Sequence, residues 1–594
     1  MGWCRGLLLF ALSLASALHA EQIFRNGMEG YASCVNAGGD TLDVPFVSIT
    51  PEFRLNGAAF PLDNTRYARL YLANEDGYQV FLGTTYAALP PAVRVIPGVY
   101  DVVYEYITGD GIPINHGAHL QRNLWIGADG TLQVDVPGIV VTGDFRHNGA
   151  AFPIEASNSG NLFLDPIYYG GEVVLGPTWQ QQSEFVVLPG AYSLVYRYGS
   201  GTAVPANVNA RLDRHDLDAS GMHVFDVPSV LVNVTFQLNG GEFPDSAYER
   251  GMFSLGGAAG DHADLADSLA TTAQRRVVPG TYDVHYSRIA GGNIVPRNDD
   301  AIVAGPFDFS GAGSVFANVV TNDVSGAFSI NGAAPPASVY ETGDVFVVDP
   351  STGAKTVIGA THEQAYEARL VAQHYAIGYR HVAGGGGTAP FNPDTVIVAD
   401  WNAVADTSRD IDIGAGTFSG SLSLNGGAFP GSVFDSGSMY LQPTGGGPPT
   451  LLGRTHYGSF DQKVIPGSYV VAYQHDAGAT VPRNEYATLG GKKSIVADSG
   501  GLIIPVDIDV ASVELARGLS LNGGAFPGAD NAYFYLRHRH VYGDDQAYWG
   551  QSTFGSLSTN IVPGRYELIY AHSSGGSIPQ NNYQRIACWD VPGG

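Results

Sequence analysis

One stretch of nine or ten residues recurs along this chain and limits what the chain can fold into. It first occurs at residues 95–104, with the sequence VIPGVYDVVY, and returns at 187–196, 277–286, 371–379, 464–473 and 561–570. Every copy holds two tyrosines four positions apart, with an aliphatic residue midway between them. These tyrosines are Tyr100, Tyr104, Tyr192, Tyr196, Tyr282, Tyr286, Tyr375, Tyr379, Tyr469, Tyr473, Tyr566 and Tyr570. Residues two positions apart share one face of a strand, so the pattern predicts a strand whose tyrosines face a core.

A second interpretation of these tyrosines is open at this stage. A row of exposed rings could stack against sugar rings or bases. The aliphatic residue between the two tyrosines favours core packing instead, with each hydroxyl bonded to a backbone group at the rim of a sheet. We therefore predict that the twelve tyrosines form the structural core of the repeats.

Two shorter elements accompany each tyrosine strand in a fixed order. An Asn-Gly pair precedes the strand, at Asn56, Asn148, Asn239, Asn331, Asn425 and Asn522. A proline, one residue and an asparagine follow it, and these asparagines are Asn115, Asn207, Asn298, Asn392, Asn484 and Asn581. Asn-Gly predicts a tight hairpin, because both residues accept positive φ. An Asp-Val-Pro element also occurs, at Asp43, Asp135, Asp226 and Asp590. Elements that return in fixed order every 91 to 97 residues indicate six homologous repeats of about 92 residues.

Each repeat holds about seven short apolar segments separated by glycine, proline, asparagine and aspartate, and none has a sustained helical period. This content suits a two-sheet sandwich better than a propeller blade of about 45 residues. We predict an all-β chain of six tandem β-sandwich repeats. The predicted boundaries are 1–20 for a signal peptide, 21–39 for a lead-in, and 40–131, 132–222, 223–314, 315–408, 409–503 and 504–594 for the repeats. The fourth repeat is degenerate, because Ala372-Gln373 replaces its Pro-Gly.

Asn-Gly-x-x-Phe-Pro, followed about 40 residues later by Val-x-Pro-Gly-x-Tyr-x-Val-x-Tyr, resembles the carboxypeptidase regulatory-like, or transthyretin-like, sandwich domains. The pattern is also similar to other Pro-Gly-x-Tyr repeats of bacterial surface proteins. The resemblance covers roughly half of each repeat. It implies an Ig-like or transthyretin-like sandwich, and its motifs are turns and strands that bring no active site with them.

The N-terminus has the pattern of an export signal. Arg5 supplies a positive charge, residues 7–15 are apolar, and small residues follow as far as Ala20. The apolar run is too short to span a bilayer, and no later stretch is long enough. The formal net charge of -26 disfavours nucleic acid and anionic membranes as partners, since both require basic patches. We predict an exported protein that is extracellular, on the cell surface or in the periplasm.

Cys34 and Cys588 remain after removal of such a signal, one near each end of the chain. An exported protein permits a disulfide between them. Six domains about 30 Å across would extend for about 180 Å in a line, whereas a disulfide requires Cα atoms within about 7 Å. Pairing therefore requires an array that curls back on itself. Two free thiols, or a link between chains, are the alternatives.

Catalytic and metal-binding patterns are weak. The sequence has no Gly-x-Ser-x-Gly elbow, no phosphate-binding loop and no cysteine with a catalytic role. His538 and His540 alternate along a candidate strand as a metal pair could, but no third ligand is near them. We predict no enzymatic activity, no cofactor and no metal.

These observations favour a non-enzymatic secreted or cell-surface repeat protein with a structural, adhesive or protein-interaction role. Its partner would be an extracellular protein or polysaccharide, and repetition would multiply weak contacts. The alternative is an array of carbohydrate- or peptide-binding modules, which requires aromatic residues exposed on one face. The candidates for such a face are Trp125, Trp179, Trp401 and Trp549, whose positions do not recur between repeats.

Overall fold

The computed structural model describes residues 35–36, 41–87, 90–385, 387–405, 407–495, 503–540 and 543–592. The predicted signal peptide and most of the lead-in lie outside these residues. Within them the chain is built from β-strands joined by turns, which confirms the predicted all-β fold. The helical elements here are short 3-10 turns at Thr178–Gln180, Ala258–Gly260, Thr361–Glu363, Thr455–Tyr457 and Ser552–Phe554.

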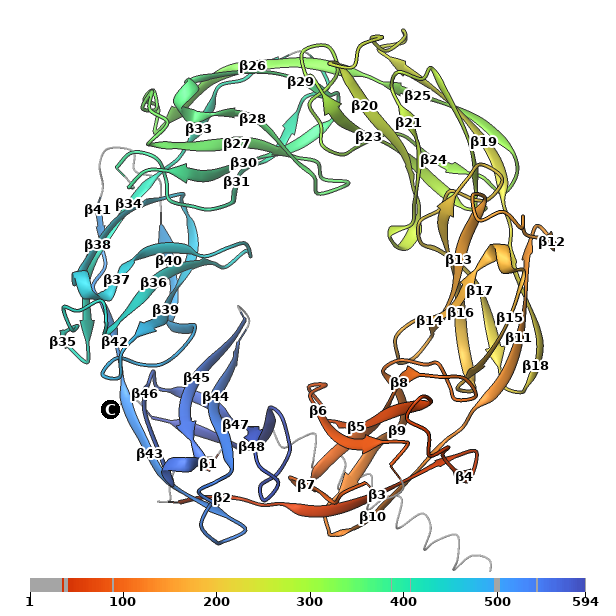
Figure 1. Cartoon of the computed structure of the whole chain (residues 1–594). Helices are drawn as coiled ribbons and strands as arrows, with labels where there is room; N and C mark the ends of the chain where they lie inside the picture. The colour runs from red at the N-terminus through yellow and green to blue at the C-terminus, as the bar shows by residue number, and fades with distance from the viewer. Residues whose placement is uncertain are drawn as a thin grey trace, which may run out of the picture.

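Buried apolar side chains of the described residues form six clusters. Two sheets enclose each cluster, and we call a cluster with its two sheets a module, numbered 1 to 6 in chain order. In every module one sheet faces the centre of the molecule and the other lies on the perimeter (Figure 1). The modules are therefore β-sandwiches.

The inner sheets share one strand order, in which the tyrosine strand pairs with the strand that follows the hairpin. They are β6(Gln79–Thr84)-β5(Tyr67–Ala73)-β8(Gly98–Thr108)-β9(Ala118–Ile126); β14(Val173–Pro177)-β13(Ser159–Pro166)-β16(Gly190–Ser200)-β17(Ala210–Leu217); β21(His262–Asp267)-β20(Arg250–Gly256)-β23(Thr281–Ala290)-β24(Ala301–Asp308); β28(Lys355–Ala360)-β27(Thr342–Val348)-β30(His374–Ala383)-β31(Thr395–Asn402); β37(Thr450–Arg454)-β36(Ser436–Pro443)-β39(Gly467–Ala477)-β40(Ala487–Ile495); and β1(Val35–Asn36)-β48(Gln584–Val591)-β47(Gly564–Ser574)-β44(Asn531–His540)-β45(Gly543–Gln551).

The outer sheets combine an antiparallel neighbour with a parallel one. They are β10(Gly130–Val136)-β3(Val47–Leu55)-β4(Ala58–Ala59), with β7(Val93–Val95) also on β3; β12(Ala150–Ala151)-β11(Ile139–His147)-β15(Gln182–Val187), with β18(Gly221–Val227) on β11; β22(Thr272–Val277)-β19(Val230–Leu238)-β25(Gly313–Val319); β29(Ala365–Val371)-β26(Thr321–Ile330)-β32(Thr407–Ser408), with β33(Ile411–Ile413) on β26; β35(Gly427–Ala428)-β34(Gly416–Leu424)-β38(Ser459–Val464), with β41(Ile503–Pro505) and β42(Ile508–Val510) on β34; and β2(Thr41–Val44)-β43(Val513–Leu521)-β46(Ser556–Ile561).

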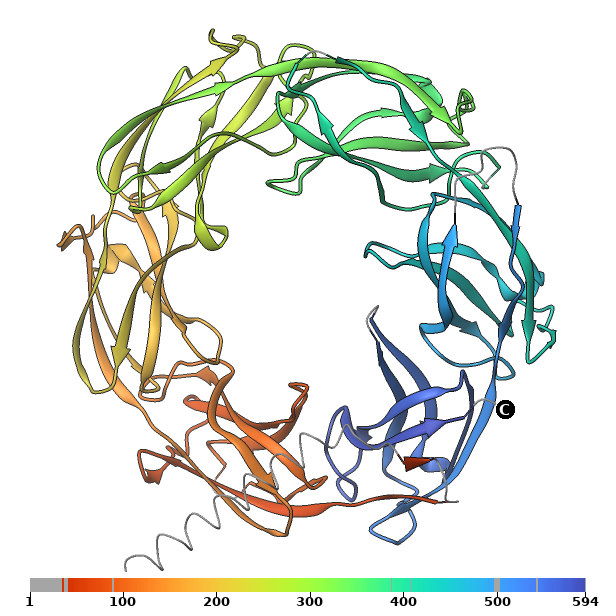
Figure 2. The ribbon, with the colours of Figure 1, turned by 180° about the vertical axis from the view of Figure 1, so that it is seen from behind.

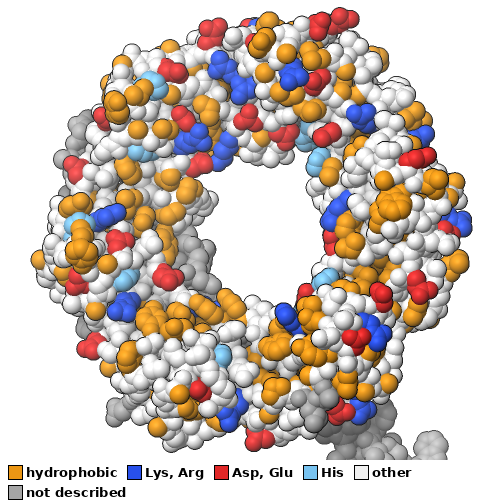
Figure 3. Space-filling model, viewed as in Figure 1, with side chains coloured by type: hydrophobic (Ala, Val, Ile, Leu, Met, Phe, Trp, Pro, Cys, Tyr) orange, Lys and Arg blue, Asp and Glu red, His pale blue; other side chains and the backbone are white. Residues whose placement is uncertain are grey.

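The modules follow one another around a closed ring, which Figure 2 shows from behind. Closure takes place inside module 6, where strands from both ends of the chain meet. β2 pairs in parallel with β43, and β1 pairs in parallel with β48. The central opening is not filled by side chains, and charged groups of both signs lie around its rim (Figure 3). The six modules therefore form an array that curls back on itself and not a linear one.

The Asn-Gly pairs form the hairpins that their residue types predict. Asn56 and Gly57 have φ angles of 50° and 77°, and the other five pairs adopt the same positive φ values within a few degrees. Positive φ at both central residues is the geometry of a type I′ turn, which suits the right-handed twist of paired strands. The apolar residues before each pair therefore lie on β3 and on the corresponding strands of the other modules.

The predicted repeat boundaries remain predictions. The boundary at 131/132 falls within β10, whose Val134 and Val136 belong to the core of module 1. Leu42 and Val44, which fall within the predicted first repeat at 40–131, lie in the core of module 6. We propose that each module ends after its Asp-Val-Pro-like strand, and that the strand at 41–44 completes the last module.

Candidate functional site at the module junctions

The asparagine of each Pro-x-Asn element lies at the centre of a junction between two modules. Asn115 of module 1 donates from its amide nitrogen to the Tyr192 hydroxyl at 3.0 Å, and its amide oxygen accepts from the Leu188 N–H at 2.8 Å. The Tyr192 hydroxyl donates to the Leu188 carbonyl at 2.6 Å. Asn115 is 1% exposed and Tyr192 3% exposed, so water does not compete for these bonds. We call this arrangement the asparagine clamp.

The clamp recurs at every junction of the ring. The pairs, each an asparagine with a tyrosine of the next module, are Asn115–Tyr192, Asn207–Tyr282, Asn298–Tyr375, Asn392–Tyr469, Asn484–Tyr566 and Asn581–Tyr100. The last pair joins module 6 to module 1, with 2.7 Å between the Asn581 amide nitrogen and the Tyr100 hydroxyl. The ring is thus closed by the same contact that joins consecutive modules.

The second tyrosine of each strand holds the Pro-x-Asn element from within its own module. The Tyr104 hydroxyl donates to the Pro113 carbonyl at 2.6 Å. The equivalent bonds are Tyr196–Pro205, Tyr286–Pro296, Tyr379–Pro390, Tyr473–Pro482 and Tyr570–Pro579. Burial raises the pKa of all twelve phenols, that of Tyr282 to about 12, so they are protonated donors at neutral pH.

An apolar contact accompanies each clamp. The residue four positions before the clamp tyrosine is buried in the core of the preceding module, as Leu188 is in module 1 and Ile96 in module 6. Its counterparts at the other junctions are Val278, Val371, Ile465 and Val562. Neighbouring cores are therefore joined, because each module supplies one side chain to the interior of the module before it.

A second junction contact lies on the outer perimeter. The amide oxygen of each Asn-Gly asparagine accepts a hydrogen bond from the backbone N–H of the residue that begins the next module. The amide nitrogen donates to the carbonyl or to the hydroxyl group of the same residue. Asn56 bonds the Gly138 carbonyl and N–H at 3.0 and 2.8 Å, and Asn522 bonds Phe46 in the same way across the closing junction. The Asn-Gly hairpin is thus part of the junction as well as a turn.

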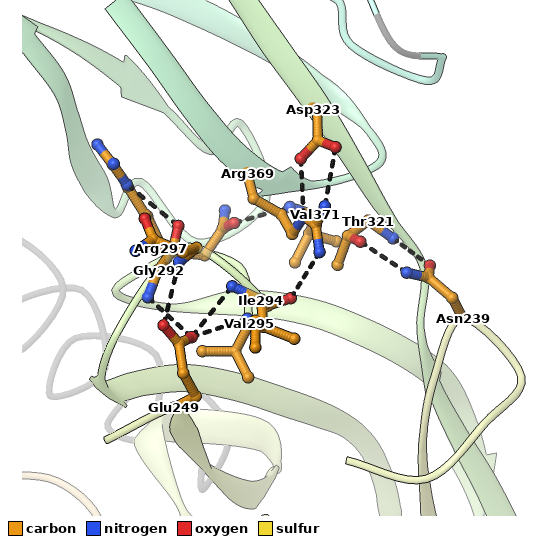
Figure 4. A network of polar contacts seen from close by, with 12 residues as sticks. Asn239, Glu249, Gly292, Ile294, Val295, Arg297, Thr321, Asp323, Arg369 and Val371 are labelled. Atoms are coloured by element: carbon orange, nitrogen blue, oxygen red, sulfur yellow. Dashed lines mark hydrogen bonds and ion pairs between the residues drawn. The ribbon is translucent and has the colours of Figure 1, made fainter. Parts of the chain in front are cut away.

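Figure 4 shows the perimeter contact of Asn239, and further polar contacts around Arg369 and Glu249, where module 3 meets module 4. Asn239 and Thr321 exchange two hydrogen bonds of 2.8 Å. Arg369 binds Asp323 through two hydrogen bonds of 2.7 and 2.8 Å, which lower the pKa of that carboxyl, and a third Arg369 nitrogen donates to the Ile294 carbonyl at 3.1 Å. The loop that carries Ile294 is held by Glu249, which accepts from consecutive backbone N–H groups. The loop is therefore held by hydrogen bonds from both modules.

The closing junction carries contacts beyond the clamp. Arg537, whose side chain is 7% exposed, lies 2.8 Å from both Asp76 of module 1 and Glu567 of module 6. Tyr583 stacks between Tyr78 and Tyr535, with ring centroids 4.8 and 5.4 Å apart. Module 6, which is assembled from both chain ends, is therefore attached firmly to module 1.

A cavity of about 400 Å³ opens between the inner sheets of modules 1 and 2. Side chains from β9 and from the loop after β13 line it, among them His119, Arg122, Tyr168 and Tyr169. Sequence reasoning did not single out these residues, because they do not belong to the repeated elements. Their only signal is a pair of adjacent tyrosines at a position where the other repeats have no such pair.

The residues that the sequence analysis singled out lie in different places. The twelve repeat tyrosines are each 3% exposed or less. Cys588 is disulfide-bonded, while Cys34 lies outside the described residues, so their pairing stays a prediction. The tryptophans do not share an exposed face, because Trp401 and Trp549 are buried whereas Trp125 is 66% and Trp179 39% exposed.

Within the described ranges, no three histidine, cysteine or acidic side chains are grouped as a metal site would require. In the same part of the chain, no helix has the length and apolar character needed to cross a membrane.

Comparison with protein-family models finds no match, and comparison with curated proteins finds none. The resemblance to carboxypeptidase regulatory-like domains therefore stays a prediction. Among solved structures, the chain is similar to the TIE protein of Bacillus anthracis, with 10% identity over 60% of this chain and 69% of that one and a TM-score of 0.13. It is similar to a streptococcal ancillary pilin, with 10% identity over 47% and 98% and a TM-score of 0.15.

The third similar structure is a pair of B repeat units of the collagen-binding protein of Staphylococcus aureus, with 9% identity over 57% and 93% and a TM-score of 0.14. With TM-scores this low, the similarity says nothing about how the whole chains are arranged.

Proposed function

We propose that this chain is a non-enzymatic, exported scaffold, which presents binding surfaces around a closed ring in a structural or adhesive role outside the cytoplasm. The observation that carries the proposal is the recurrence of the asparagine clamp at all six junctions, including the one from module 6 back to module 1. Six copies of one buried contact fix the inner sheets relative to one another. A preorganised surface loses little conformational freedom when it binds.

Charge and cysteine chemistry support the compartment. A disulfide at Cys588 suits an oxidising environment, such as the extracellular space or the periplasm. The net charge of -26 suits solubility there and opposes binding to nucleic acid or anionic lipid. The partner that we propose is an extracellular protein or polysaccharide.

The test compares the closed ring with an opened one. Val44→Asp places a carboxylate in the core of module 6, where Val44 is 0% exposed, and should release β2. Both proteins are passed over immobilised collagen, fibrinogen, chitin and peptidoglycan in surface plasmon resonance. We expect the native ring to be retained on at least one surface and the opened variant to bind at least tenfold more weakly. Retention on none of these polymers, or equal retention of both proteins, would contradict the proposal.

Binding of carbohydrate rather than protein is favoured by one specific observation. The cavity between modules 1 and 2 combines exposed aromatic rings with polar groups that are already held in place.

A further inference from the structure

The cavity between modules 1 and 2 has the size and lining of a small-molecule site. Its volume of about 400 Å³ lies within the range of about 300–1,000 Å³ that is usual for ligand pockets. Three prolines form apolar walls, namely Pro137, Pro166 and Pro189. Tyr168 is 71% exposed and Tyr169 48% exposed, so rings that could contact a ligand remain open to solvent.

Asp101 of β8 organises the polar side of the cavity. Its carboxylate lies 2.7 Å from His119 Nδ1, accepts from the Asn123 N–H at 2.8 Å, and lies 3.6 Å from Arg122 Nε. Asn123 has a φ of 54°, and the register between β8 and β9 shifts next to it. A bulge of this kind redirects the side chains beside it, and here it holds Arg122 over the cavity.

Arg122 and His119 are also held by Tyr169 of module 2. The Arg122 guanidinium lies 3.9 Å from the centroid of the Tyr169 ring, and the His119 ring lies 5.1 Å from it. The polar groups of module 1 and the aromatic ring of module 2 therefore fix one another. The cavity exists only while the junction is assembled.

The balance of charge and hydrogen-bonding capacity selects the class of ligand. Asp101 offsets the charge of Arg122, so the cavity has no surplus cation to attract an anion. His119 Nδ1 lies 2.7 Å from Asp101, and in the tautomer that donates from Nδ1–H to this carboxylate, Nε2 is an acceptor. Arg122 offers donors only. A ligand here must both donate and accept hydrogen bonds while it presents an apolar surface to Tyr168.

We propose that this cavity binds a neutral saccharide of one or two sugar units, which gives a ligand class to the interaction scaffold proposed above and rests on that function. A sugar ring carries C–H groups on its faces, which pack on aromatic rings, and hydroxyl groups on its edge, which both donate and accept. Tyr168 contacts the face of the sugar. Arg122 donates to one hydroxyl and His119 accepts from another.

The site is confined to this junction, because the other modules lack the pair that builds it. Strand register places Ser193, Asp283, Ala376, Val470 and Glu567 at the position of Asp101. The same register places Arg211, Ile302, Val396, Thr488 and Arg585 at the position of His119. The combination of aspartate and histidine occurs in module 1 alone.

The test is saturation-transfer-difference NMR and calorimetry on the intact chain, with cellobiose, maltose and N,N′-diacetylchitobiose as neutral probes and sialyllactose as an anionic probe. Arg122→Gln and Tyr168→Ala change the site, and Tyr248→Ala is the matched control, since Tyr248 is 84% exposed in module 3. We expect at least one neutral probe to bind. Both site variants should weaken that binding at least tenfold, and the control should leave it unchanged. Arg122 and Tyr168 are exposed enough that thermal melting should show all three variants folded.

Three results would overturn the proposal. They are the absence of a signal from every neutral probe, equal binding by the native chain and both site variants, and tighter binding of sialyllactose than of the neutral sugars.

Failure of the saccharide site can be distinguished from failure of the proposed scaffold function. If the ring is retained on a protein surface while no disaccharide binds, the scaffold stands and only the saccharide site falls. If disaccharides bind while the opened ring adheres as well as the closed one, the scaffold falls and the site stands.

Discussion

Module 1 and module 6 have the same two-sheet design but differ in how the chain runs through them. In module 1 the chain passes from β9 to β10 through residues 127–129, and β10 pairs with β3 at seven positions. In module 6 the strand that corresponds to β9 is β48, which β1 also flanks, and the strand that corresponds to β10 is β2, which pairs with β43 at only four positions. The last sandwich is completed by a strand from the opposite end of the chain.

The comparison shows which contacts a module needs and which it can replace. Asp43 of β2 accepts from the Gly523 N–H at 2.8 Å, as Asp135 of β10 accepts from the Gly57 N–H at 2.8 Å. Leu42 and Val44 fill the core of module 6 as Val134 and Val136 fill that of module 1. Side-chain contacts therefore specify where the closing strand binds. A module can form without a continuous backbone to its last outer strand.

The largest effect is expected from a carboxylate in the closing strand. Val44→Asp buries a carboxyl group without a partner. Even an unpartnered hydroxyl or amide costs about 2–7 kcal/mol to bury and an ionised carboxylate costs more, while only four paired positions oppose the loss of β2. The ring should open, and small-angle scattering should show a larger radius of gyration. Val136→Asp is the matched control, because Val136 is equally buried on β10. It should destabilise module 1 by a similar amount while the ring stays closed, since the backbone holds β10 in place.

A compact scattering profile for Val44→Asp would show that β2 is not needed for closure. Expansion of the Val136→Asp variant to the same extent would show that chain continuity does not distinguish the two modules.

The second prediction concerns the disulfide. Val35 pairs with Trp589, so the residues that follow Cys34 and Cys588 are partners in β1 and β48. We expect these cysteines to be joined, which would restore in module 6 a covalent link that the backbone supplies in module 1. Cys588→Ser should lower the stability of module 6 by about 2–5 kcal/mol, measured by thermal melting. Mass spectrometry without reduction should find one peptide that contains both cysteines, whereas two thiols that can be alkylated in the native protein would refute the pairing.

The third prediction compares the closing clamp with an internal one. Asn581→Ala leaves the Ile96 N–H without its acceptor in a buried junction, at a cost of about 1–3 kcal/mol. Asn207 also donates to Asp261, which is 7% exposed, so Asn207→Ala removes a bond to a charged group and should cost more. Chemical denaturation of the two variants measures the difference. Equal losses would mean that Asp261 contributes nothing to the internal clamp.

Parts of this arrangement could be predicted from local pattern. The alternation around Tyr100 and Tyr104 is enough to place their rings in a core, and Asn-Gly is enough to place a hairpin with positive φ. The partner of each Pro-x-Asn asparagine could not be read in this way, because Asn115 and Tyr192 are 77 positions apart and in different repeats. The sequence signal for closure lay elsewhere, in Cys34 and Cys588, because a disulfide between them requires an array that curls back on itself.

The cavity between modules 1 and 2 was beyond sequence reasoning for a different reason. Its polar groups come from β8 and β9, its aromatic ring comes from a loop of the next module, and the bulge at Asn123 sets their geometry. No repeat pattern links these positions. The repeated motifs show what the modules have in common. The residues that distinguish one junction from the others lie outside these motifs.

The smallest effect per side chain is expected from alkaline pH. A tyrosine in the unfolded chain ionises near pH 10, whereas burial raises the pKa of Tyr282 to about 12. Below pH 10 the clamp contributes its full stability. Between pH 10 and 12 the unfolded chain releases a proton that the folded chain keeps, so stability falls, by about 2 kcal/mol for this one tyrosine at pH 12. Burial raises the pKa of Tyr100 as well, so the closing clamp should weaken in the same direction.

Denaturant unfolding at pH 8, 10 and 11.5 measures this dependence. Tyr282→Phe and Tyr100→Phe should each lose stability at pH 8, because the hydroxyl that receives the asparagine is gone, and each should show a shallower decline above pH 10. The two variants compare an internal clamp with the closing one under identical chemistry. If Tyr100→Phe alone opened the ring in scattering at pH 8, the closing junction would depend on its clamp more than the internal junctions do, in spite of the added Arg537 and Tyr583 contacts. An unchanged pH profile in both variants would show that these phenols are not the groups whose ionisation opens the junctions.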